Sequence, residues 1–222
     1  MDKPTILIVP GGFSLPDLYS EVIAHVSREG YTIEALHLPS VGYKTNVPGT
    51  MQDDAAFIAS EITKHSDKGN DVILIGHSYG GLPATESTKG LSKSHRQQQG
   101  NTGGLDDGWL HQGDISVTAS NVFNDLPKEE GEKWAKMSTR HSGSTFPASL
   151  SHAGFKDVPV SYLVCTKDLA QEPELQRASI AMMEGQIGGK IDVTEIKSGH
   201  APNASRPREV ADWIISIAKQ ST

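Results

Sequence analysis

The sequence predicts an α/β protein with a doubly wound, mostly parallel sheet. Segments with strand character alternate along the chain with segments of helical periodicity, which is the order of successive βαβ units. Three of the strand segments are continuous apolar runs, as expected for strands that helices cover on both faces. With 222 residues, the chain suits one domain over 1–222 that has a full hydrophobic core.

Five segments carry the strand signal. Apolar and β-branched residues dominate each of them, and turn-forming residues flank them. Right-handed crossovers between such strands would place them in one sheet. The segments are 5–9, 32–38, 72–76, 160–165 and 191–196.

Apolar residues at helical spacing indicate helices between and after these strands. The first helix ends at Gly30, which suits the position just after a helix, and the second closes near Gly69. The last helix begins after the sequence SRP near the end of the chain. The residues that mark the three helices are Leu18, Val22, Ile23 and Val26, then Ala55, Ile58, Ala59 and Ile62, then Val210, Trp213, Ile214 and Ile217.

Residues 90–127 differ from the rest because they are polar, contain several glycines and hold no apolar run of strand length. Only 115–119 alternates in the manner of a half-exposed strand, and a short helix is expected at about 129–137. A long irregular segment inside a compact domain usually has a function of its own or is disordered. We therefore expect a lid or insertion over 90–150, within the single domain.

The sequence GHSYGG, residues 76–81, follows an apolar strand and precedes a helix-compatible segment. Gly-x-Ser-x-Gly in that context is the pattern of a nucleophile elbow, which holds a serine on a strained turn. The glycines at 76 and 80 would let strand and helix approach closely. The alternative is a glycine-rich turn with an incidental serine. We interpret Ser78 as a candidate nucleophile at the edge where open α/β sheets bind ligands.

A serine hydroxyl needs a base and a group that orients the base. On this kind of sheet the chain order is serine, then an acid after a later strand, then a histidine. Asp168 follows strand 160–165, and His200 lies between strand 191–196 and the last helix, so both belong to the edge that holds Ser78. The alternatives are a surface turn and a loop histidine. The ordered set predicts a triad of Ser78, His200 and Asp168.

A negatively charged oxygen that develops on a substrate needs preorganised donors, which backbone N–H groups usually supply. One donor is expected to be the amide of Tyr79, directly after the serine. The other should come from the loop VPGGFS after the first strand, where Gly12 or Phe13 is best placed. A simple Gly-Gly turn is the alternative for this loop.

Five stretches together resemble a known family. They are VPGGFSLPDLY, LPSVG, VILIGHSYGGLPATESTKGLSK, YLVCTKDLAQEPELQ and SGHAPNASRPREVADWI, and they are similar to small α/β-hydrolases of fungi and bacteria and to the plant methyl esterase and hydroxynitrile lyase group. The resemblance covers most of 4–90 and 121–218. It implies the α/β-hydrolase fold, with Ser78 as nucleophile, His200 as base, Asp168 as acid, and Gly12, Phe13 and Tyr79 around the oxyanion.

The chain departs from that family in one respect. Members normally carry another buried strand after the GLSK segment, and here QGNTGGLDDGWLHQGD stands in its place. Either 115–119 substitutes for this strand, or the sheet lacks a central member and two neighbouring strands lose a partner.

Four further residues are candidates for a substrate pocket: His77, Trp109, Phe123 and Trp134. His77 either lines the pocket or lies buried beneath the elbow, and the aromatic residues are either the apolar underside of the lid or ordinary packing. The other histidines lack metal-ligand spacing, so we expect neither a metal site nor a cofactor. The single cysteine, Cys165, lies in an apolar strand and is interpreted as a packing residue.

Bulk properties limit the partners. A formal net charge of -7 and a sequence pI near 5.7 argue against binding to nucleic acid. The apolar run at the N-terminus is too short for a signal peptide, and no stretch has membrane-spanning length. A single cysteine fits a reducing compartment. We expect a cytoplasmic protein with a small-molecule substrate and no membrane partner, and a homodimer is compatible with the sequence.

These observations predict a serine hydrolase that cleaves a small, fairly apolar carboxylic ester, or a related acyl or C–C bond. A lyase or cyclase of secondary metabolism on the same triad is an alternative, because pocket polarity and water access decide between them. A weakly active or inactive ligand-binding relative is another alternative, which the shortened central region suggests.

Overall fold

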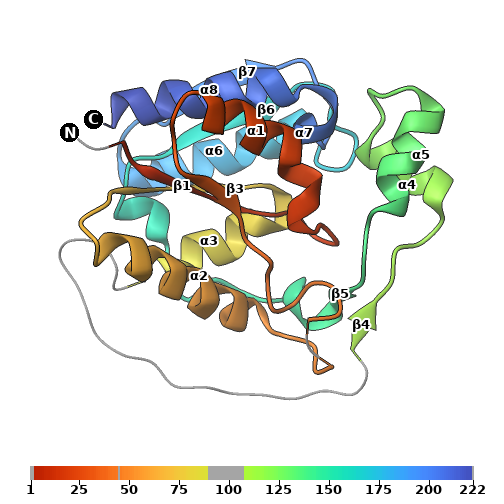
Figure 1. Cartoon of the computed structure of the whole chain (residues 1–222), viewed down its shortest axis with the longest axis horizontal. Coiled ribbons are helices and arrows are strands. Elements are labelled where there is room, and N and C mark those ends of the chain that lie inside the picture. The colour runs from red at the N-terminus through yellow and green to blue at the C-terminus, as the bar shows by residue number, and fades with distance from the viewer. Residues whose placement is uncertain (1–2, 45, 90–107, 222) are drawn as a thin grey trace.

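The computed structural model describes residues 3–44, 46–89 and 108–221. Figure 1 shows strands between layers of helices, with α4 and α5 set apart at one end of the molecule. The strands are β1 (Thr5–Val9), β2 (Ile33–Ala35), β3 (Val72–Gly76), β4 (Trp109–Leu110), β5 (His141–Ser142), β6 (Ser161–Cys165) and β7 (Asp192–Ile196).

Helices surround these strands. Within the described ranges, none of them combines the length and the apolar character needed to cross a membrane. The α-helices are α1 (Ser20–Arg28), α2 (Met51–Ser66), α3 (Gly81–Ser87), α4 (Ile115–Val122), α5 (Lys128–Lys136), α6 (Pro173–Ile187), α7 (Pro202–Ser205) and α8 (Pro207–Gln220). The 3-10 helices are η1 (Pro16–Tyr19), η2 (Ser78–Gly80), η3 (Gly143–Thr145) and η4 (Gly154–Lys156).

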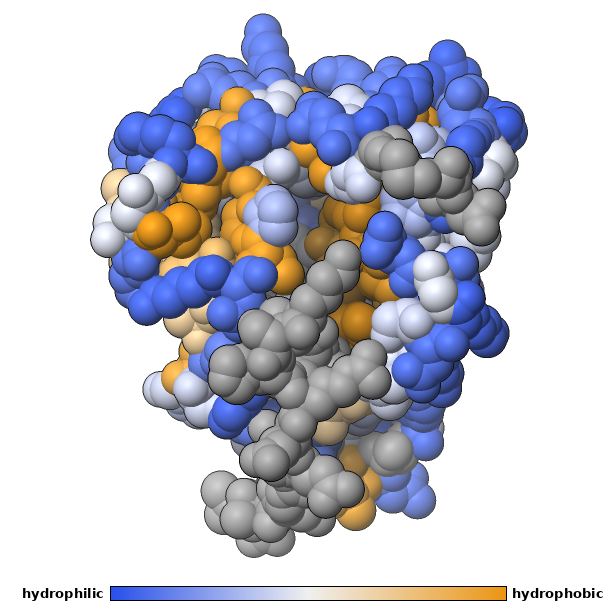
Figure 2. All heavy atoms as spheres, turned by 90° about the vertical axis from the view of Figure 1, so that its left-hand side faces the viewer, coloured by the Kyte–Doolittle hydropathy of each residue, from blue (hydrophilic) through white to orange (hydrophobic). Residues whose placement is uncertain are grey.

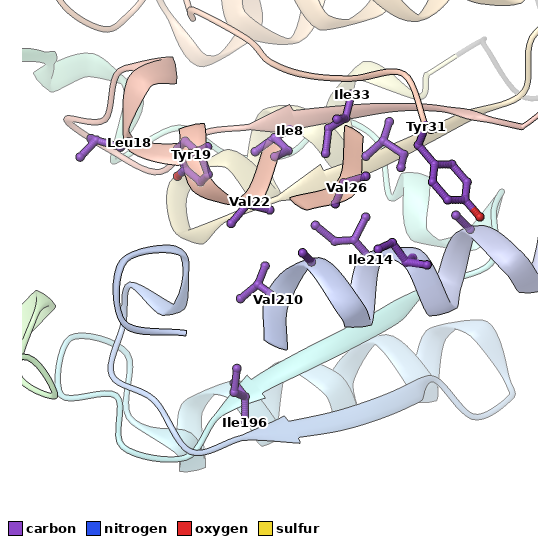
Figure 3. Close-up of a cluster of buried hydrophobic side chains, with 14 of the residues drawn as sticks. Ile8, Leu18, Tyr19, Val22, Val26, Tyr31, Ile33, Ile196, Val210 and Ile214 are labelled. Atoms are coloured by element: carbon purple, nitrogen blue, oxygen red, sulfur yellow. The ribbon is translucent and has the colours of Figure 1, made fainter. Parts of the chain in front are cut away.

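Strand β1 is the centre of the main sheet, whose order is β2-β1-β3 with all pairs parallel. Its side chains alternate between the two faces, as those of any strand do. Ile6 and Ile8 pack with α1 and α8, whereas Leu7 and Val9 pack with α2 and α3. Figure 3 shows the first of these clusters, in which α1 lies between β1 and α8. Each such fully buried side chain contributes about 1.5–3 kcal/mol through the hydrophobic effect.

The predicted strands and helices of this framework are confirmed. Strands 5–9 and 72–76 have the predicted bounds, and the other three are shorter by one or more residues at an end. The helix predicted at about 129–137 is α5. Helix α1 ends just before Gly30, which has a φ of 77°. Sequence patterns find these elements because burial on a helix or strand repeats with a fixed period.

The predicted gap in the sheet is present in the described part of the chain. Strands β6 and β7 pair in parallel with each other, and no described strand joins β6 to β3. Val72, Ile73, Leu74 and Ile75 of β3 are only partly buried, whereas all of β1 is buried. Figure 2 shows the end of the molecule at the left of Figure 1, where apolar side chains reach the surface inside a hydrophilic rim.

The prediction of a strand at 115–119 was wrong, because this segment lies in helix α4. Asp114 caps the helix, and its side chain accepts hydrogen bonds from the backbone N–H groups of Ser116 and Val117. Ala119 and Phe123, four residues apart, form one apolar face that packs with α5. The alternation of small and β-branched residues here therefore belongs to a helix, and the segment does not replace the missing strand.

Candidate active site

The turn after β3 holds Ser78 in a strained conformation. Its φ is 51°, a region that residues with a side chain rarely adopt. The turn is possible because Gly80 lies against the end of β1, where an added Cβ would overlap the carbonyl oxygens of Val9 and Pro10. Ser78 is exposed at this turn. The local geometry is that of a nucleophile elbow.

His200 brings the serine and the carboxylate together. Its Nε2 lies 2.8 Å from Ser78 Oγ, and its Nδ1 lies 2.8 Å from Asp168 Oδ2. The Asp168 carboxylate accepts a hydrogen bond from Nδ1–H, which leaves Nε2 as the acceptor for the serine hydroxyl. The three side chains that the sequence predicted as a triad therefore form one chain of hydrogen bonds.

Asp168 is buried, with 4% of its surface exposed, and its two oxygens are fully engaged. Oδ1 accepts the backbone N–H groups of Ala170 and Gln171, each at 2.8 Å, and Oδ2 accepts Gln176 Nε2 at 3.2 Å as well as His200. Four donors around one carboxyl group fix its position. The acid is thus held in one orientation toward the histidine.

Residues of two segments lie beside the serine in the same cavity. Gly12 and Phe13, in the loop after β1, line the same cavity as Ser78 and Tyr79. Phe13 has a φ of 61°, which is unusual for a bulky residue and turns the peptide of this loop. The N–H of Gly11 is already bound to Tyr19 Oη at 3.0 Å. Phe13 and Ser78, which both have a strained backbone, therefore border the cavity beside the serine hydroxyl.

His77 connects η1 with the loop of His200. Its Nε2–H donates to the backbone oxygen of His200 at 2.8 Å, and its Nδ1 accepts the hydroxyl proton of Tyr19 at 2.7 Å. Burial, together with the nearby His200, lowers the pKa of His77 to about 4, so the ring is neutral near pH 7. His77 is partly buried and also lines the cavity.

A cavity of about 360 Å³ opens at Ser78 and His200. This volume is at the small end of the range for ligand pockets. Helix α4 and the segments beside it supply one wall, and η1 and the loop after β1 supply the other. The apolar lining is formed by Phe13, Leu18, Val122, Phe123, Phe146 and Ala201.

The four pocket candidates divide into two pairs. His77 and Phe123 line the cavity, whereas Trp109 and Trp134 are not among the lining residues. Trp134 stacks behind Phe123 with a centroid distance of 6.1 Å, and Trp109 is buried beneath Arg140. Large aromatic side chains near a cavity are as readily used to support its wall as to form it.

Sequence reasoning missed a second group of polar side chains, formed by Ser40, Asp54 and His141. All three are completely buried, and they lie behind the loop of Gly12. The one sequence signal was Asp54, which lies one turn before Ile58 on the apolar face of α2. A charged residue on that face needs buried partners, which no local pattern could identify.

Other reactive groups have structural roles. Burial raises the pKa of the Cys165 thiol to about 11, so this side chain stays neutral and packs in β6. Among residues 3–44, 46–89 and 108–221, no group of three or more histidine, cysteine, aspartate or glutamate side chains has the arrangement of a metal site.

Two fungal proteins are similar to this chain over nearly its whole length. "Probable hydrolase R7" of a Phoma species is 31% identical, with 98% of this chain and 99% of the relative covered. "Alpha/beta hydrolase nvfD" of Aspergillus novofumigatus is 28% identical, with 100% and 99% covered. The alignments extend over 243 and 252 positions, more than the 222 residues here, so both relatives have residues that this chain lacks.

The fold is also found in solved structures. The structure of tomato methylketone synthase I matches with a TM-score of 0.73 at 17% identity, and all of both chains is covered. Residues 6–213 match the alpha/beta hydrolase family. The elbow at the end of β3, the parallel strands and the helices on both faces agree with that match. The chain belongs to the alpha/beta hydrolase family.

Proposed function

We propose that the protein hydrolyses a small, fairly apolar carboxylic ester, with Ser78 as nucleophile, His200 as general base and Asp168 as the acid that orients it. The observation that carries the proposal is the unbroken chain of hydrogen bonds from the exposed Ser78 hydroxyl to the buried Asp168 carboxylate. Each distance is 2.8 Å, within the range in which a proton can be transferred.

The reaction has two stages. Ser78 Oγ attacks the ester carbon while His200 Nε2 takes its proton, and the carbonyl oxygen becomes negatively charged next to the N–H groups of Phe13 and Tyr79. His200 then gives its proton to the alcohol as the bond to carbon breaks. Water attacks the resulting acyl-enzyme by the same route and releases the carboxylic acid.

The lining of the cavity supports an apolar substrate of modest size. Its aromatic walls would bury an aliphatic or aromatic acyl or alcohol group and gain about 25 cal/mol per Å² of apolar surface. Polar groups in the lining, among them His111 and Gln112, would orient a small polar substituent. The part of the 90–150 region that the structure describes supplies both, which supports a lid function.

Hydrolysis is favoured over a lyase or cyclase reaction by two features. Ser78 is exposed, so water can reach an acyl group bound to it. Lys167, the charged residue next to the acid, is exposed and is not among the residues that line the cavity. A cation within the cavity would have favoured chemistry on a carbanion or a leaving cyanide.

The test combines a mechanism-based probe with a simple ester. A fluorophosphonate should label the wild-type protein on Ser78, and p-nitrophenyl butyrate should be hydrolysed in the same preparation. Ser78→Ala should lose both the label and the hydrolysis, and His200→Ala should lose hydrolysis. Ser60→Ala, at an exposed serine of α2, is the matched control and should keep both.

Persistent labelling of Ser78→Ala would overturn the assignment of the nucleophile. If the wild-type protein is labelled but hydrolyses no short ester, the assignment of the nucleophile stands and only the proposed reaction is wrong.

A further inference from the structure

A buried polar cluster lies directly behind the wall that is proposed to stabilise the oxyanion. Ser40 and His141 are 0% exposed, as is Asp54, and none of the three lines the cavity. They come from the loop after β2, from β5 and from α2, far apart in the sequence. A charged and polar cluster of this kind is costly to bury, so it needs an explanation.

Asp54 anchors the residue that follows the nucleophile. Its Oδ2 accepts the hydroxyl of Tyr79 at 2.6 Å and also the hydroxyl of Ser40, while Oδ1 accepts the backbone N–H of Ser40 at 2.9 Å. Burial raises the pKa of Asp54 to about 6, with Asp53 adding to the rise, and the hydrogen bonds from Ser40 and Tyr79 oppose it. The group is therefore mainly a carboxylate at pH 7. Because the backbone N–H of Tyr79 is a proposed oxyanion donor, its anchored side chain fixes that donor.

The partners of His141 determine which ring nitrogen carries the proton. Nε2 lies 3.2 Å from Ser40 Oγ and 3.2 Å from Thr145 Oγ1. Both hydroxyls donate elsewhere, Ser40 to Asp54 and Thr145 to the backbone oxygen of Ser142 at 2.8 Å. Each hydroxyl oxygen can then only accept from His141, so the proton is on Nε2. Nδ1 is a bare, buried acceptor, and no hydrogen-bond partner for it lies among the described residues.

His141 touches both segments that face the serine. A Cβ added at Gly12 would lie 3.1 Å from His141 Nδ1, so the loop after β1 rests directly on the ring. The ring of Phe13 meets it edge-on with a centroid distance of 5.3 Å, and the ring of Tyr79 does so at 4.5 Å. One imidazole thus contacts both segments that carry the proposed donors.

We propose that Asp54 and His141 are positioning residues, which hold the N–H groups of Phe13 and Tyr79 at the separation that an oxyanion requires. The inference rests on the function proposed above. Preorganised donors stabilise a transition state because they do not have to reorient as charge develops. The cluster provides this rigidity from behind the site, through Tyr79 on one side and Gly12 on the other.

The same cluster is not a second nucleophilic triad. Ser40 is completely buried, and its hydroxyl donates to Asp54 instead of to the histidine. A nucleophile must reach a substrate and give its proton to a base, and Ser40 does neither.

The test separates transition-state stabilisation from substrate binding. Tyr79→Phe removes one oxygen atom, and Asp54→Asn removes the charge. Tyr31→Phe, at a buried tyrosine in the α1–α8 core, is the matched control. For each protein, kcat and KM are measured with p-nitrophenyl butyrate, and Tm is measured by circular dichroism. Binding of trifluoromethyl heptyl ketone is also measured, because this ketone adds to the serine and leaves a negatively charged oxygen.

We expect Tyr79→Phe and Asp54→Asn to lower kcat by about 10- to 100-fold and to weaken ketone binding by a similar factor, with KM within about twofold. Tyr31→Phe should leave kcat, KM and ketone binding at wild-type values. If folded Tyr79→Phe keeps the wild-type kcat and ketone affinity, the proposal is wrong, whether Tm falls or not. A rise in KM alone would also overturn it. Tyr79→Phe decides the matter if Asp54→Asn does not fold.

Failure of the proposed function itself would appear separately. In that case Ser78→Ala would hydrolyse the ester as fast as the wild type, before any variant of the buried cluster is considered.

Discussion

Two groups of serine, histidine and aspartate side chains lie close together in the described part of the chain, and they differ in exposure and in hydrogen-bond direction. In the first, Ser78 is exposed and its hydroxyl faces a free lone pair of the histidine. In the second, Ser40 is buried and its hydroxyl faces the carboxylate. The first group is Ser78, His200 and Asp168, and the second is Ser40, His141 and Asp54.

The comparison shows that residue types alone do not define a catalytic site. A histidine serves as a base only where its acceptor nitrogen points to the nucleophile, because a proton moves along an existing hydrogen bond. Asp168 binds the Nδ1–H of His200 and so leaves Nε2 as the acceptor. His141 has its proton on the side that faces the serine, and its acceptor faces Gly12. The second group is therefore suited to holding structure and not to transferring protons.

The largest expected difference between the groups concerns the serines. Ser78→Ala should lower kcat/KM for p-nitrophenyl butyrate by about 10⁴- to 10⁶-fold, as loss of a nucleophile does. Ser40→Ala should lower it by no more than about 100-fold and should keep the fluorophosphonate label. Mass spectrometry of labelled peptides checks which serine carries the fluorophosphonate label. Label attached to Ser40 in Ser78→Ala would contradict the distinction.

The two aspartates should differ in the next largest effect. Asp168→Asn should lower kcat by about 10⁴-fold, because an amide that donates to Nδ1 selects the wrong tautomer of His200. Asp54→Asn should lower kcat by only about 10- to 100-fold, because it loosens donors without removing the base. Steady-state kinetics of both variants at one pH measure the ratio. Equal losses would mean that the two carboxylates serve one function.

Within the buried cluster, His141 and Asp54 should contribute to stability with opposite dependence on pH. Burial lowers the pKa of His141 from 6.5 to about 4, so its contribution to stability is present above pH 6.5 and is lost as the pH falls toward 4. Burial raises the pKa of Asp54 from 3.8 to about 6, so its contribution is present at low pH and is lost as the pH rises through 6. Between pH 4 and 6.5 the two slopes oppose each other.

His141→Gln should remove the first of these slopes. At pH 7 the variant should have a lower free energy of unfolding than the wild type. This difference should become smaller by up to about 3 kcal/mol between pH 7 and pH 4. Urea unfolding across this range measures it, and Lys64→Gln on the exposed end of α2 serves as the control. A difference that does not change with pH would mean that His141 is not buried in its neutral form.

The smallest expected effect concerns the contact between the second group and the loop after β1. Gly12→Ala places a methyl group about 3.1 Å from His141 Nδ1, which is closer than most real contacts of this kind. The variant should lose about 1–2 kcal/mol of stability and show a lower kcat with an unchanged KM. Thermal unfolding and kinetics check this. A fully active, stable variant would show that the loop does not rest on the ring.

Local patterns were sufficient for much of the fold and for naming the residues of the proposed site. The apolar runs at 5–9 and 72–76 became strands with those bounds, and the elbow formed where GHSYGG follows the second of them. Asp168 and His200 were found because parallel strands bring their carboxyl ends to one edge. At 115–119 the pattern favoured a strand and the chain formed α4, since its apolar face is needed against α5.

The sequence by itself determined the order of strands and helices, the position of the elbow and the residues proposed as the triad, because each depends on a short period or on the edge where a strand ends. Only the tertiary structure decided how the described histidines differ. His141 meets Ser40 across 101 positions, and His77 and His200 meet around the elbow. Which nitrogen carries a proton depends on the groups that surround the ring, and distant segments supply those groups.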